Sequence, residues 1–291
     1  MSDIMCIPCP DIQLGESPVW SYEENCLYFI DITGKRSCRI DWSTKELYST
    51  PLPKIPGCLV LTDKNTLLYG LEDGIYDEKL IRHCSRDPAS GKRFNDGKAG
   101  PDGKLYVGTI SGERKGFLYR MEGELKPVIQ NVGVSNGLDW SLDEKTMYYC
   151  DTASGTVSAY YFPEMRYKKL ILRVDSGRGR PDGLCVDVQG MIWLAVWGIG
   201  QVWRIHPEEG KVMRIWQFPA RNITCPVFGG KNMQELIVTS ARVQQEKMQG
   251  NNEADKGRDK GGSIFTVIPG ICGRRAYRVT GRSKCGCTGG K

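Results

Sequence analysis

The chain has 291 residues, of which 40% are hydrophobic and 25% are charged. These proportions are typical of a soluble globular protein and exclude a disordered or collagen-like chain. Forty basic and 34 acidic residues give a net charge of +6, and no apolar run approaches the ~20 residues of a membrane span.

The first residues, MSDIMCIPCPDIQ, have neither the basic segment nor the apolar segment of a signal peptide. We therefore expect a cytoplasmic protein whose 12 cysteines are mainly buried free thiols. Cys6-x-x-Cys9 and Cys285-x-Cys287 have incomplete spacing for a structural zinc site. Basic residues accumulate near the C-terminus, but no nucleic-acid recognition motif accompanies them.

Short β-rich runs that follow polar turns recur along the chain. There are six, at 26–30, 66–69, 104–107, 146–149, 191–194 and 235–238. Anchored on Leu27, Leu67, Leu105, Met147, Ile192 and Leu236, their successive spacings are 40, 38, 42, 45 and 44 residues. Periods of ~40–50 residues with several strands per unit indicate a β-propeller. The sequence therefore predicts an all-β fold, a six-bladed β-propeller with a central metal site.

We expect one domain over residues 1–291, with further strands at 116–120, 157–161, 201–205 and 263–267. The stretch before Gly15 is expected to supply an outer strand to the last blade and so to close the ring. The polar, Gly-rich segment 244–262 predicts a mobile loop in that blade, and 280–291 predicts a flexible basic tail.

Ten or eleven positions before each anchor lies the residue that precedes the first strand of each blade. These residues are Glu16, Gly57, Asn95, Asn136, Asp182 and Cys225. Because the inner strands of a propeller begin at one mouth of the central channel, we expect a ring there. Carboxylate and amide oxygens are the ligands of hard divalent cations. Turn capping is the alternative for any single Asn or Asp, but the matched register of Glu16, Asn136 and Asp182 favours a metal site.

Four motifs make the chain similar to a known family. They are GESPVW at 15–20, RFNDGK at 93–98, SNGLDWS at 135–141 and RPDGL at 180–184. With these motifs in order between Gly15 and Arg242, the chain resembles the regucalcin (senescence marker protein)/gluconolactonase family. That family consists of six-bladed propellers and includes sugar-lactone hydrolases.

The resemblance implies roles for six residues. Glu16, Asn136 and Asp182 would hold one divalent metal ion, which could be Ca²⁺, Zn²⁺, Mn²⁺, Mg²⁺ or Fe²⁺. Arg93 and Asn95 would bind the substrate. Glu113 would contact the substrate from the loop 111–115, which is short for the family.

The expected reaction is hydrolysis of an aldonolactone to its aldonic acid, as in a gluconolactonase or xylonolactonase. The metal would polarise the carbonyl, Asp182 would act as the catalytic base toward water, and Arg93 would orient the substrate through its planar donors. The expected partner is a small-molecule sugar lactone, with neither nucleic acid nor membrane. We expect a monomer or weak homo-oligomer.

Two other functions fit the same ligands: a calcium-binding regucalcin-like regulator without catalysis, and a metal-dependent esterase or phosphotriesterase. The segment from Gly133 to Gly137 also matches the G-x-S-x-G nucleophile elbow of α/β-hydrolases, with Ser135 at its centre. The residues that follow Ser135 read as a strand, and only one histidine, His206, lies downstream. A serine hydrolase is therefore not expected.

Overall fold

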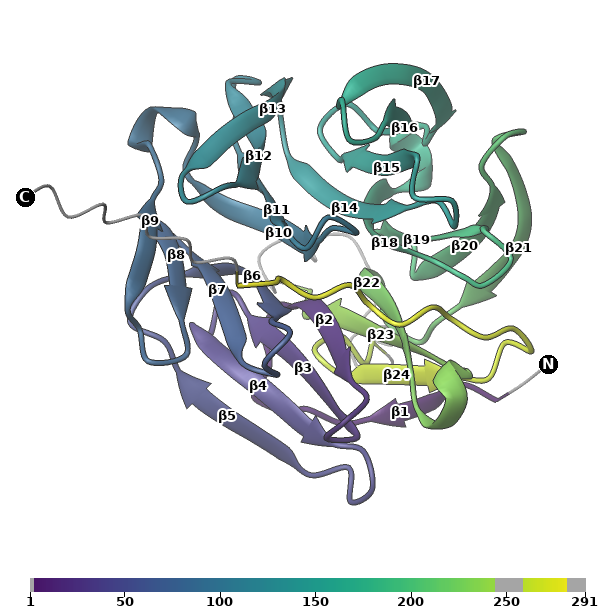
Figure 1. Cartoon of the computed structure of the whole chain (residues 1–291). Coiled ribbons are helices and arrows are strands. Elements are labelled where there is room, and N and C mark those ends of the chain that lie inside the picture. The colour runs from purple at the N-terminus through teal and green to yellow at the C-terminus, as the bar shows by residue number, and fades with distance from the viewer. Residues whose placement is uncertain (1–2, 244–258, 282–291) are drawn as a thin grey trace, which may run out of the picture.

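Six four-stranded antiparallel sheets surround a central axis in the computed structural model, which describes residues 3–243 and 259–281 (Figure 1). The inner strand of each sheet contacts the inner strands of the sheets on either side, so that the ring is complete. The predicted six-bladed β-propeller is confirmed. The described residues include no helix that is long and apolar enough to cross a membrane.

Blades one to three are built from consecutive strands. They are β2 (Gly15–Ser21), β3 (Cys26–Asp31), β4 (Arg36–Asp41) and β5 (Leu47–Pro51); β6 (Pro56–Leu61), β7 (Leu67–Leu71), β8 (Gly74–Asp77) and β9 (Arg82–Ser85); and β10 (Arg93–Ala99), β11 (Leu105–Ile110), β12 (Gly116–Met121) and β13 (Leu125–Val132).

Blades four and five follow the same plan, and blade six includes the first strand of the chain. They are β14 (Ser135–Trp140), β15 (Thr146–Asp151), β16 (Thr156–Tyr161) and β17 (Arg166–Arg173); β18 (Arg180–Val186), β19 (Ile192–Trp197), β20 (Gln201–His206) and β21 (Lys211–Gln217); and β22 (Asn222–Gly229), β23 (Glu235–Ala241), β24 (Ile264–Val267) and β1 (Met5–Ile7). The short 3-10 helices are η1 (Pro88–Ser90), η2 (Ser176–Arg178) and η3 (Lys231–Met233).

The ring closes between the N-terminal strand and the last blade. β1 pairs antiparallel with β24, with Cys6 opposite Phe265, as predicted for the stretch before Gly15. Of the predicted loop 244–262, residues 259–262 lie just before β24, and 244–258 fall outside the described residues. Of the predicted tail 280–291, only 280 and 281 are described.

Aromatic side chains fill the space between neighbouring blades. Trp193 of the fifth blade stands edge-on to Phe228 of the sixth, with ring centroids 5.4 Å apart. Tyr106 and Trp140 meet in the same way between the third and fourth blades, also at 5.4 Å. Large rings bury much apolar surface in defined geometry, so these contacts fix the fifth blade against the sixth and the third against the fourth. The ten cysteines among the described residues form no disulfide.

Two glycines allow the inner strands to approach closely. A Cβ at Gly137 would lie 2.4 Å from the amide nitrogen of Leu184 in the next blade. A Cβ at Gly183 would lie 2.4 Å from Sγ of Cys225, again one blade further on. The missing side chains therefore bring three consecutive inner strands together around the channel.

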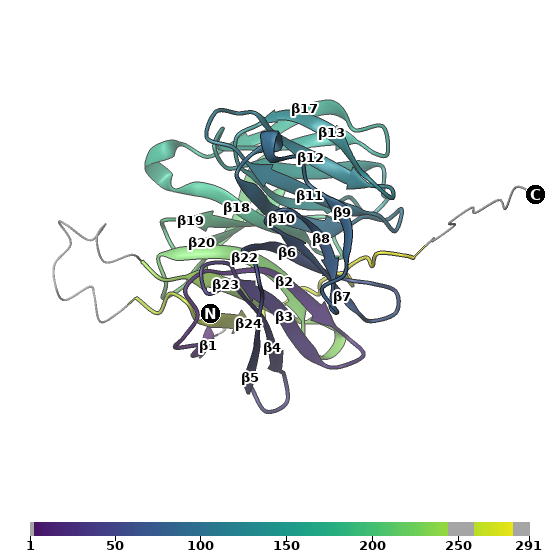
Figure 2. The ribbon, with the colours of Figure 1, turned by 90° about the vertical axis from the view of Figure 1, so that its left-hand side faces the viewer.

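The C-terminal strap, residues 268–281, crosses the channel after the last blade. It is the yellow segment that passes over the inner strands in Figure 1 and emerges beside the second blade in Figure 2. Its backbone amides at Gly273, Val279 and Thr280 donate to carbonyls in the sixth, second and third blades. These contacts lie at the mouth of the channel where the inner strands end, which we call the far mouth.

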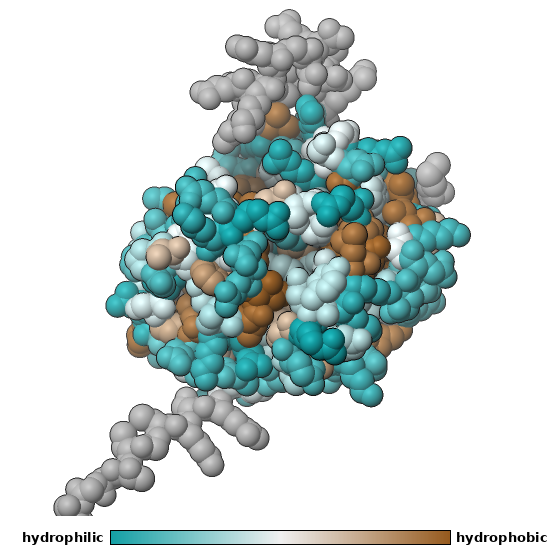
Figure 3. Space-filling model, turned by 90° about the horizontal axis from the view of Figure 1, so that it is seen from above, coloured by the Kyte–Doolittle hydropathy of each residue, from teal (hydrophilic) through white to brown (hydrophobic). Residues whose placement is uncertain are grey.

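The face of the molecule that lies at the top in Figure 1 has a mainly hydrophilic surface with separate hydrophobic patches (Figure 3).

Candidate metal centre

A β-bulge interrupts the inner strand where the predicted ring residues lie. In the fourth blade, pairing jumps from Ser135 to Leu138 and leaves Asn136 within the bulge. In the fifth blade, pairing jumps from Pro181 to Leu184 and leaves Asp182 in the same place. Bulges bend a strand and redirect its side chains. The repeated bulge accounts for the convergence of these side chains at the mouth where the inner strands begin.

The sixth blade corrects one member of the predicted ring. There Ile223 pairs with Ser240 and pairing resumes at Pro226. The residue equivalent to Asn136 is therefore Thr224, whereas Cys225 lies one position later. Thr224 is fully buried and donates from Oγ1 to the carbonyl of Gly15 at 2.7 Å. Counting back ten or eleven positions from an anchor missed this shift, because the connection from Phe228 to Leu236 is two residues longer than the equivalent connection from Val186 to Ile192 in the fifth blade.

Glu16, Asn136 and Asp182 are buried side by side at this mouth, with exposures of 8%, 4% and 5%. Asn136 donates from Nδ2 directly to Oδ1 of Asp182. The carboxyl of Glu16 acts electrostatically on Asp182 from the first blade. The structure thus brings the three predicted ligands together, from blades one, four and five.

The charges of this cluster repel one another. Burial and the neighbouring Asp96 raise the pKa of Glu16 to about 8. Burial, followed by the charges of Glu16 and Asp96, raises the pKa of Asp182 well above its ordinary range, and burial also raises the pKa of Asp96. Buried carboxyls without a compensating charge favour their neutral form. The cluster is therefore a site that a cation would stabilise.

Arg93 and Asn95 lie beside the cluster and are held in place. Nη1 of Arg93 donates to the carbonyl of Phe94 at 2.8 Å and to Oδ1 of Asn95 at 2.9 Å. Asn95 in turn donates from Nδ2 to the carbonyl of Ser135 at 2.7 Å, which joins the third blade to the fourth. The charge of Arg93 partly offsets that of Glu16. A fixed guanidinium beside an acidic cluster is suited to orienting an oxygen-rich ligand.

Glu113 is placed differently from the other predicted site residues. It lies in the turn after β11, whose last residue, Ile110, pairs with Arg93, so the turn is at the same mouth. Its side chain is 74% exposed and pairs with Lys115 at 2.6 Å. Among the described residues, no hydrogen bond or ion pair joins its side chain to Arg93 or to the acidic cluster. Its contact with substrate stays a prediction.

The residues present fit a divalent cation. Oδ1 of Asn136 is buried and receives no hydrogen bond, and a buried acceptor without a partner is costly. An oxygen-seeking cation would satisfy this atom together with the carboxylates of Glu16 and Asp182. Within residues 3–243 and 259–281, no group of three or more His, Cys, Asp or Glu side chains is arranged for a metal. The amide oxygen is thus needed as the third ligand.

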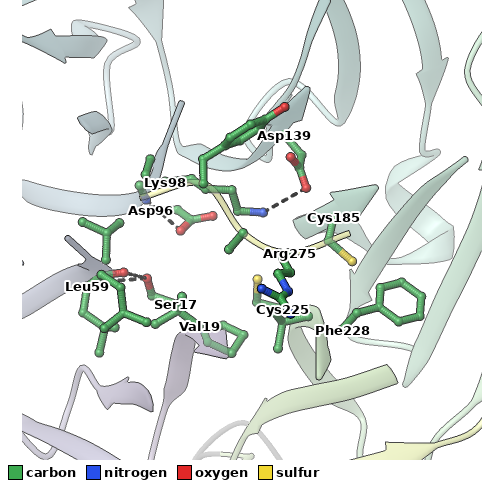
Figure 4. Close-up of a pocket in the computed structure, with 18 of the residues that line it drawn as sticks. Ser17, Val19, Leu59, Asp96, Lys98, Asp139, Cys185, Cys225, Phe228 and Arg275 are labelled. Atoms are coloured by element: carbon green, nitrogen blue, oxygen red, sulfur yellow. Dashed lines mark hydrogen bonds and ion pairs between the residues drawn. The ribbon is translucent and has the colours of Figure 1, made fainter. Parts of the chain in front are cut away.

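Beneath the cluster, the channel narrows to a cavity of about 40 Å³ (Figure 4). Lys98 points into it and contacts Asp139 at 3.4 Å, and Asp139 also pairs with Arg274 of the strap. A cavity of this size holds a few water molecules and is too small for a sugar. A substrate would therefore have to approach the cluster from the mouth that carries Arg93.

Sequence reasoning missed Asp96 and Thr152. Asp96 follows Asn95 within the quoted motif RFNDGK, and the acidic residue beside a predicted site residue was the available signal. Thr152 follows β15 and hydrogen-bonds to Asn136 at 3.0 Å. No local pattern marks it, because its partners lie 16 and 29 residues away.

Ser135 does not form a nucleophile elbow. It lies in β14, which continues as a strand to Trp140, whereas the elbow requires a turn into a helix. Its fully buried Oγ accepts a hydrogen bond from the hydroxyl of Tyr149 at 2.8 Å. The structure thus supports the expectation that this serine is not a nucleophile.

The protein is thus a six-bladed β-propeller with buried carboxylates and an amide at one mouth of its central channel. The family model described as "SMP-30/Gluconolactonase/LRE-like region" matches residues 14–242. The chain belongs to this family. Regucalcin of Xenopus laevis is 34% identical over 258 residues, which cover 82% of this chain and 86% of the relative.

Two solved structures are similar along nearly the whole chain. A luciferin-regenerating enzyme superposes with a TM-score of 0.87 and 25% identity, over 96% of this chain and 100% of the other. A protein from Agrobacterium tumefaciens, described as the calcium-binding protein regucalcin, superposes with a TM-score of 0.85 and 22% identity, over 96% and 97%. At 22% identity, the similarity to the Agrobacterium tumefaciens protein shows only that the two chains share a fold.

Proposed function

We propose that the chain is a metal-dependent sugar lactonase that opens an aldonolactone to its aldonic acid. The observation that carries the proposal is the buried cluster of Glu16, Asn136 and Asp182, with the unpartnered Oδ1 of Asn136, beside the fixed guanidinium of Arg93. Membership of a family whose description includes gluconolactonase supports it.

One divalent cation, Ca²⁺, Zn²⁺, Mn²⁺, Mg²⁺ or Fe²⁺, would be held by Glu16, Asp182 and Oδ1 of Asn136. When bound, such a cation polarises a carbonyl and lowers the pKa of water. The calcium-binding description of the Agrobacterium tumefaciens protein supports a cation in this fold.

The side chains supply the remaining steps. Oδ1 of Asp182 accepts from Asn136, which leaves its second oxygen to take a proton from the attacking water. Arg93 and Asn95 orient the sugar, because their mutual hydrogen bond fixes the guanidinium before substrate arrives. The cavity beneath the cluster, about 40 Å³ in volume, is too small for the sugar, so we expect the lactone at the mouth that carries Arg93.

Proton release from glucono-1,5-lactone, with and without EDTA, tests this function. We expect turnover well above spontaneous hydrolysis that EDTA abolishes and added metal restores. Asp182→Asn should lower kcat about 100-fold or more, as for loss of a general base, with metal content checked by elemental analysis. Glu208→Gln is the control, because Glu208 lies on the surface of the propeller and forms an ion pair with Lys169 at 2.7 Å. Turnover that is insensitive to EDTA would overturn the proposal.

A non-catalytic calcium-binding protein is the second candidate, favoured by the name regucalcin among the relatives. It predicts tight calcium binding by calorimetry and no turnover of gluconolactone or xylonolactone. A metal-dependent esterase or phosphotriesterase would use the same ligands, and a panel of aryl esters and phosphotriesters would then give a higher kcat/KM than the lactones.

The proposal includes a cytoplasmic monomer or weak homo-oligomer whose partner is the small-molecule lactone, without nucleic acid or membrane. Sedimentation of the purified chain over a range of concentrations would measure its self-association.

A further inference from the structure

Thr152 connects two blades at the acidic cluster. It follows β15 in the fourth blade, and its Oγ1 donates to the carbonyl of Pro181 in the fifth blade at 2.7 Å. The same oxygen accepts from Nδ2 of Asn136 at 3.0 Å. The hydroxyl therefore contacts the residue before one candidate ligand and the side chain of another.

The direction of these hydrogen bonds is determined by the chemistry of the partners. The carbonyl of Pro181 can only accept, so the single proton of the Thr152 hydroxyl is committed to it. Toward Asn136 the hydroxyl can then only accept. Asn136 must therefore turn its NH₂ group, and not its oxygen, toward Thr152.

The other proton of the same NH₂ group goes to the Asp182 carboxylate, Oδ1. With both amide protons used, the opposite end of the amide carries only Oδ1. That atom is buried and has no donor among the described residues. The Thr152 hydroxyl, whose single proton is committed to Pro181, fixes this orientation of the amide and removes the usual ambiguity between the oxygen and nitrogen of an Asn side chain.

We infer that Thr152 is a positioning residue that orients Asn136 so that its oxygen faces the cation. The inference rests on the proposed metal site. It also explains why an amide is required at position 136: a carboxylate there would have no proton for Thr152 or Asp182 and would add a fourth charge to Glu16, Asp96 and Asp182. Partners that orient metal ligands typically contribute 10–100-fold to affinity.

The test compares Thr152→Val, which keeps the shape and removes the hydroxyl, with Thr152→Ser, which keeps the hydroxyl. Calorimetric titration of the EDTA-treated full chain with CaCl₂ and MnCl₂ measures the Kd of each metal. We expect Thr152→Val to weaken binding about 10–100-fold, and Thr152→Ser to stay close to wild type. Equal Kd values for Thr152→Val and wild type would overturn the inference.

A double-mutant cycle separates orientation from general destabilisation. In an Asn136→Ala background, Thr152→Val should change Kd no further, because the oxygen that Thr152 orients is absent. An equal loss in both backgrounds would overturn the inference. Thr266→Val is the matched control: Thr266 is buried in β24, hydrogen-bonds to Glu235 at 3.2 Å and lies away from the cluster. If wild type itself binds neither metal, the proposed function fails instead.

Discussion

Asp31 and Asp151 occupy equivalent positions at the ends of the second strands of two blades. Asp31 accepts from the two backbone amides that precede Gly15. Asp151 accepts from the two that precede Ser135. In each blade the next residue is a candidate ligand: Glu16 follows Gly15, and Asn136 follows Ser135. A buried carboxylate thus holds the backbone from which the ligand projects.

Asp151→Asn should therefore affect both stability and the site. An Asn offers one oxygen where the carboxylate offers two, so at least one backbone amide loses its acceptor. Hydrogen bonds to charged groups are worth about 1.5–3 kcal/mol, and we expect a loss of about 2 kcal/mol in urea unfolding together with weaker calcium binding. Asp187→Asn is the control, because Asp187 is buried at the far mouth and pairs with Arg204 at 2.9 Å. It should lower stability and leave calcium affinity unchanged.

Glu122 is a charged residue whose contribution depends on pH. Its carboxylate contacts Lys104, Lys126 at 3.2 Å and Arg120 at 3.0 Å. Hydrogen bonds from the two lysines lower its pKa from 4.5 to about 2. A carboxyl group whose pKa is lower in the folded than in the unfolded protein stabilises the folded state at pH values above its unfolded-state pKa. This stabilisation is lost as the pH falls through its folded-state pKa.

The expected result is a stability that declines as pH falls from about 4.5 to about 2 in the wild type, and declines less in Glu122→Gln. Chemical unfolding at pH 6, 4 and 3 would measure it. The difference in stability between the two proteins should shrink from pH 6 to pH 3 and should vanish only below the folded-state pKa of about 2. Glu113→Gln serves as the comparison, since its ion pair with Lys115 is largely exposed and such pairs contribute little. A constant difference between wild type and Glu122→Gln at all three pH values would contradict the assignment.

At the scale of the element, the inner strands determine the geometry of the site. Gly137 follows one candidate ligand, and its Cβ would lie 2.4 Å from the backbone nitrogen of Leu184 and 2.7 Å from the carbonyl oxygen of Asp182. Backbone atoms cannot move aside as the end of a flexible side chain can. A methyl group here would push the fourth and fifth blades apart.

Gly137→Ala should therefore destabilise the protein by about 1–3 kcal/mol, the usual cost of overpacking, and weaken cation binding because Asn136 and Asp182 separate. Gly177→Ala is the matched control, since a Cβ at Gly177 meets no atom within 4 Å. Thermal unfolding and calcium titration of both variants would measure the effects. A Gly137→Ala protein with wild-type affinity would show that the strands tolerate the separation.

The sequence predicted the second strand of every blade but not the bulges of the first. Runs such as 146–149 are rich in β-forming residues and follow polar turns, so a local pattern reveals them. β15 (Thr146–Asp151) lies where that run predicted. A bulge depends on which residues pair across two strands, and neighbouring residues do not encode it. For this reason the predicted ring was right at Asn136 and Asp182 and one residue late at Cys225, where Thr224 holds the equivalent position.

At the scale of the whole molecule, two terminal segments complete the propeller. The N-terminal strand was predictable because the last repeat lacked an outer strand. The strap was not, since its sequence has no alternating pattern and its contacts join residues distant in the chain. Arg274 pairs with Asp139, and Tyr277 donates to Glu144 at 2.7 Å. These contacts hold the strap across the far mouth.

Closure of the ring by β1 gives the last prediction. The N-terminal segment buries Ile12 completely, and Arg242, which follows β23, donates to the carbonyl of Ile12 at 2.9 Å. Because the sixth blade has only three strands without β1, removal of residues 1–11 should lower the unfolding midpoint. Ile12→Ala in the full chain should cost about 2–5 kcal/mol, the range for a fully buried aliphatic residue.

Met5→Ala provides the matched comparison, because Met5 lies on β1 with 56% of its surface exposed. Its effect should stay within about 0.5 kcal/mol, since it keeps the backbone pairing with β24 and removes little buried surface. Thermal and urea unfolding of the truncated chain and both variants would measure the three effects. If the truncated chain unfolds at the wild-type midpoint, the ring is held by contacts between the inner strands alone, and β1 serves only to cover the edge of the last blade.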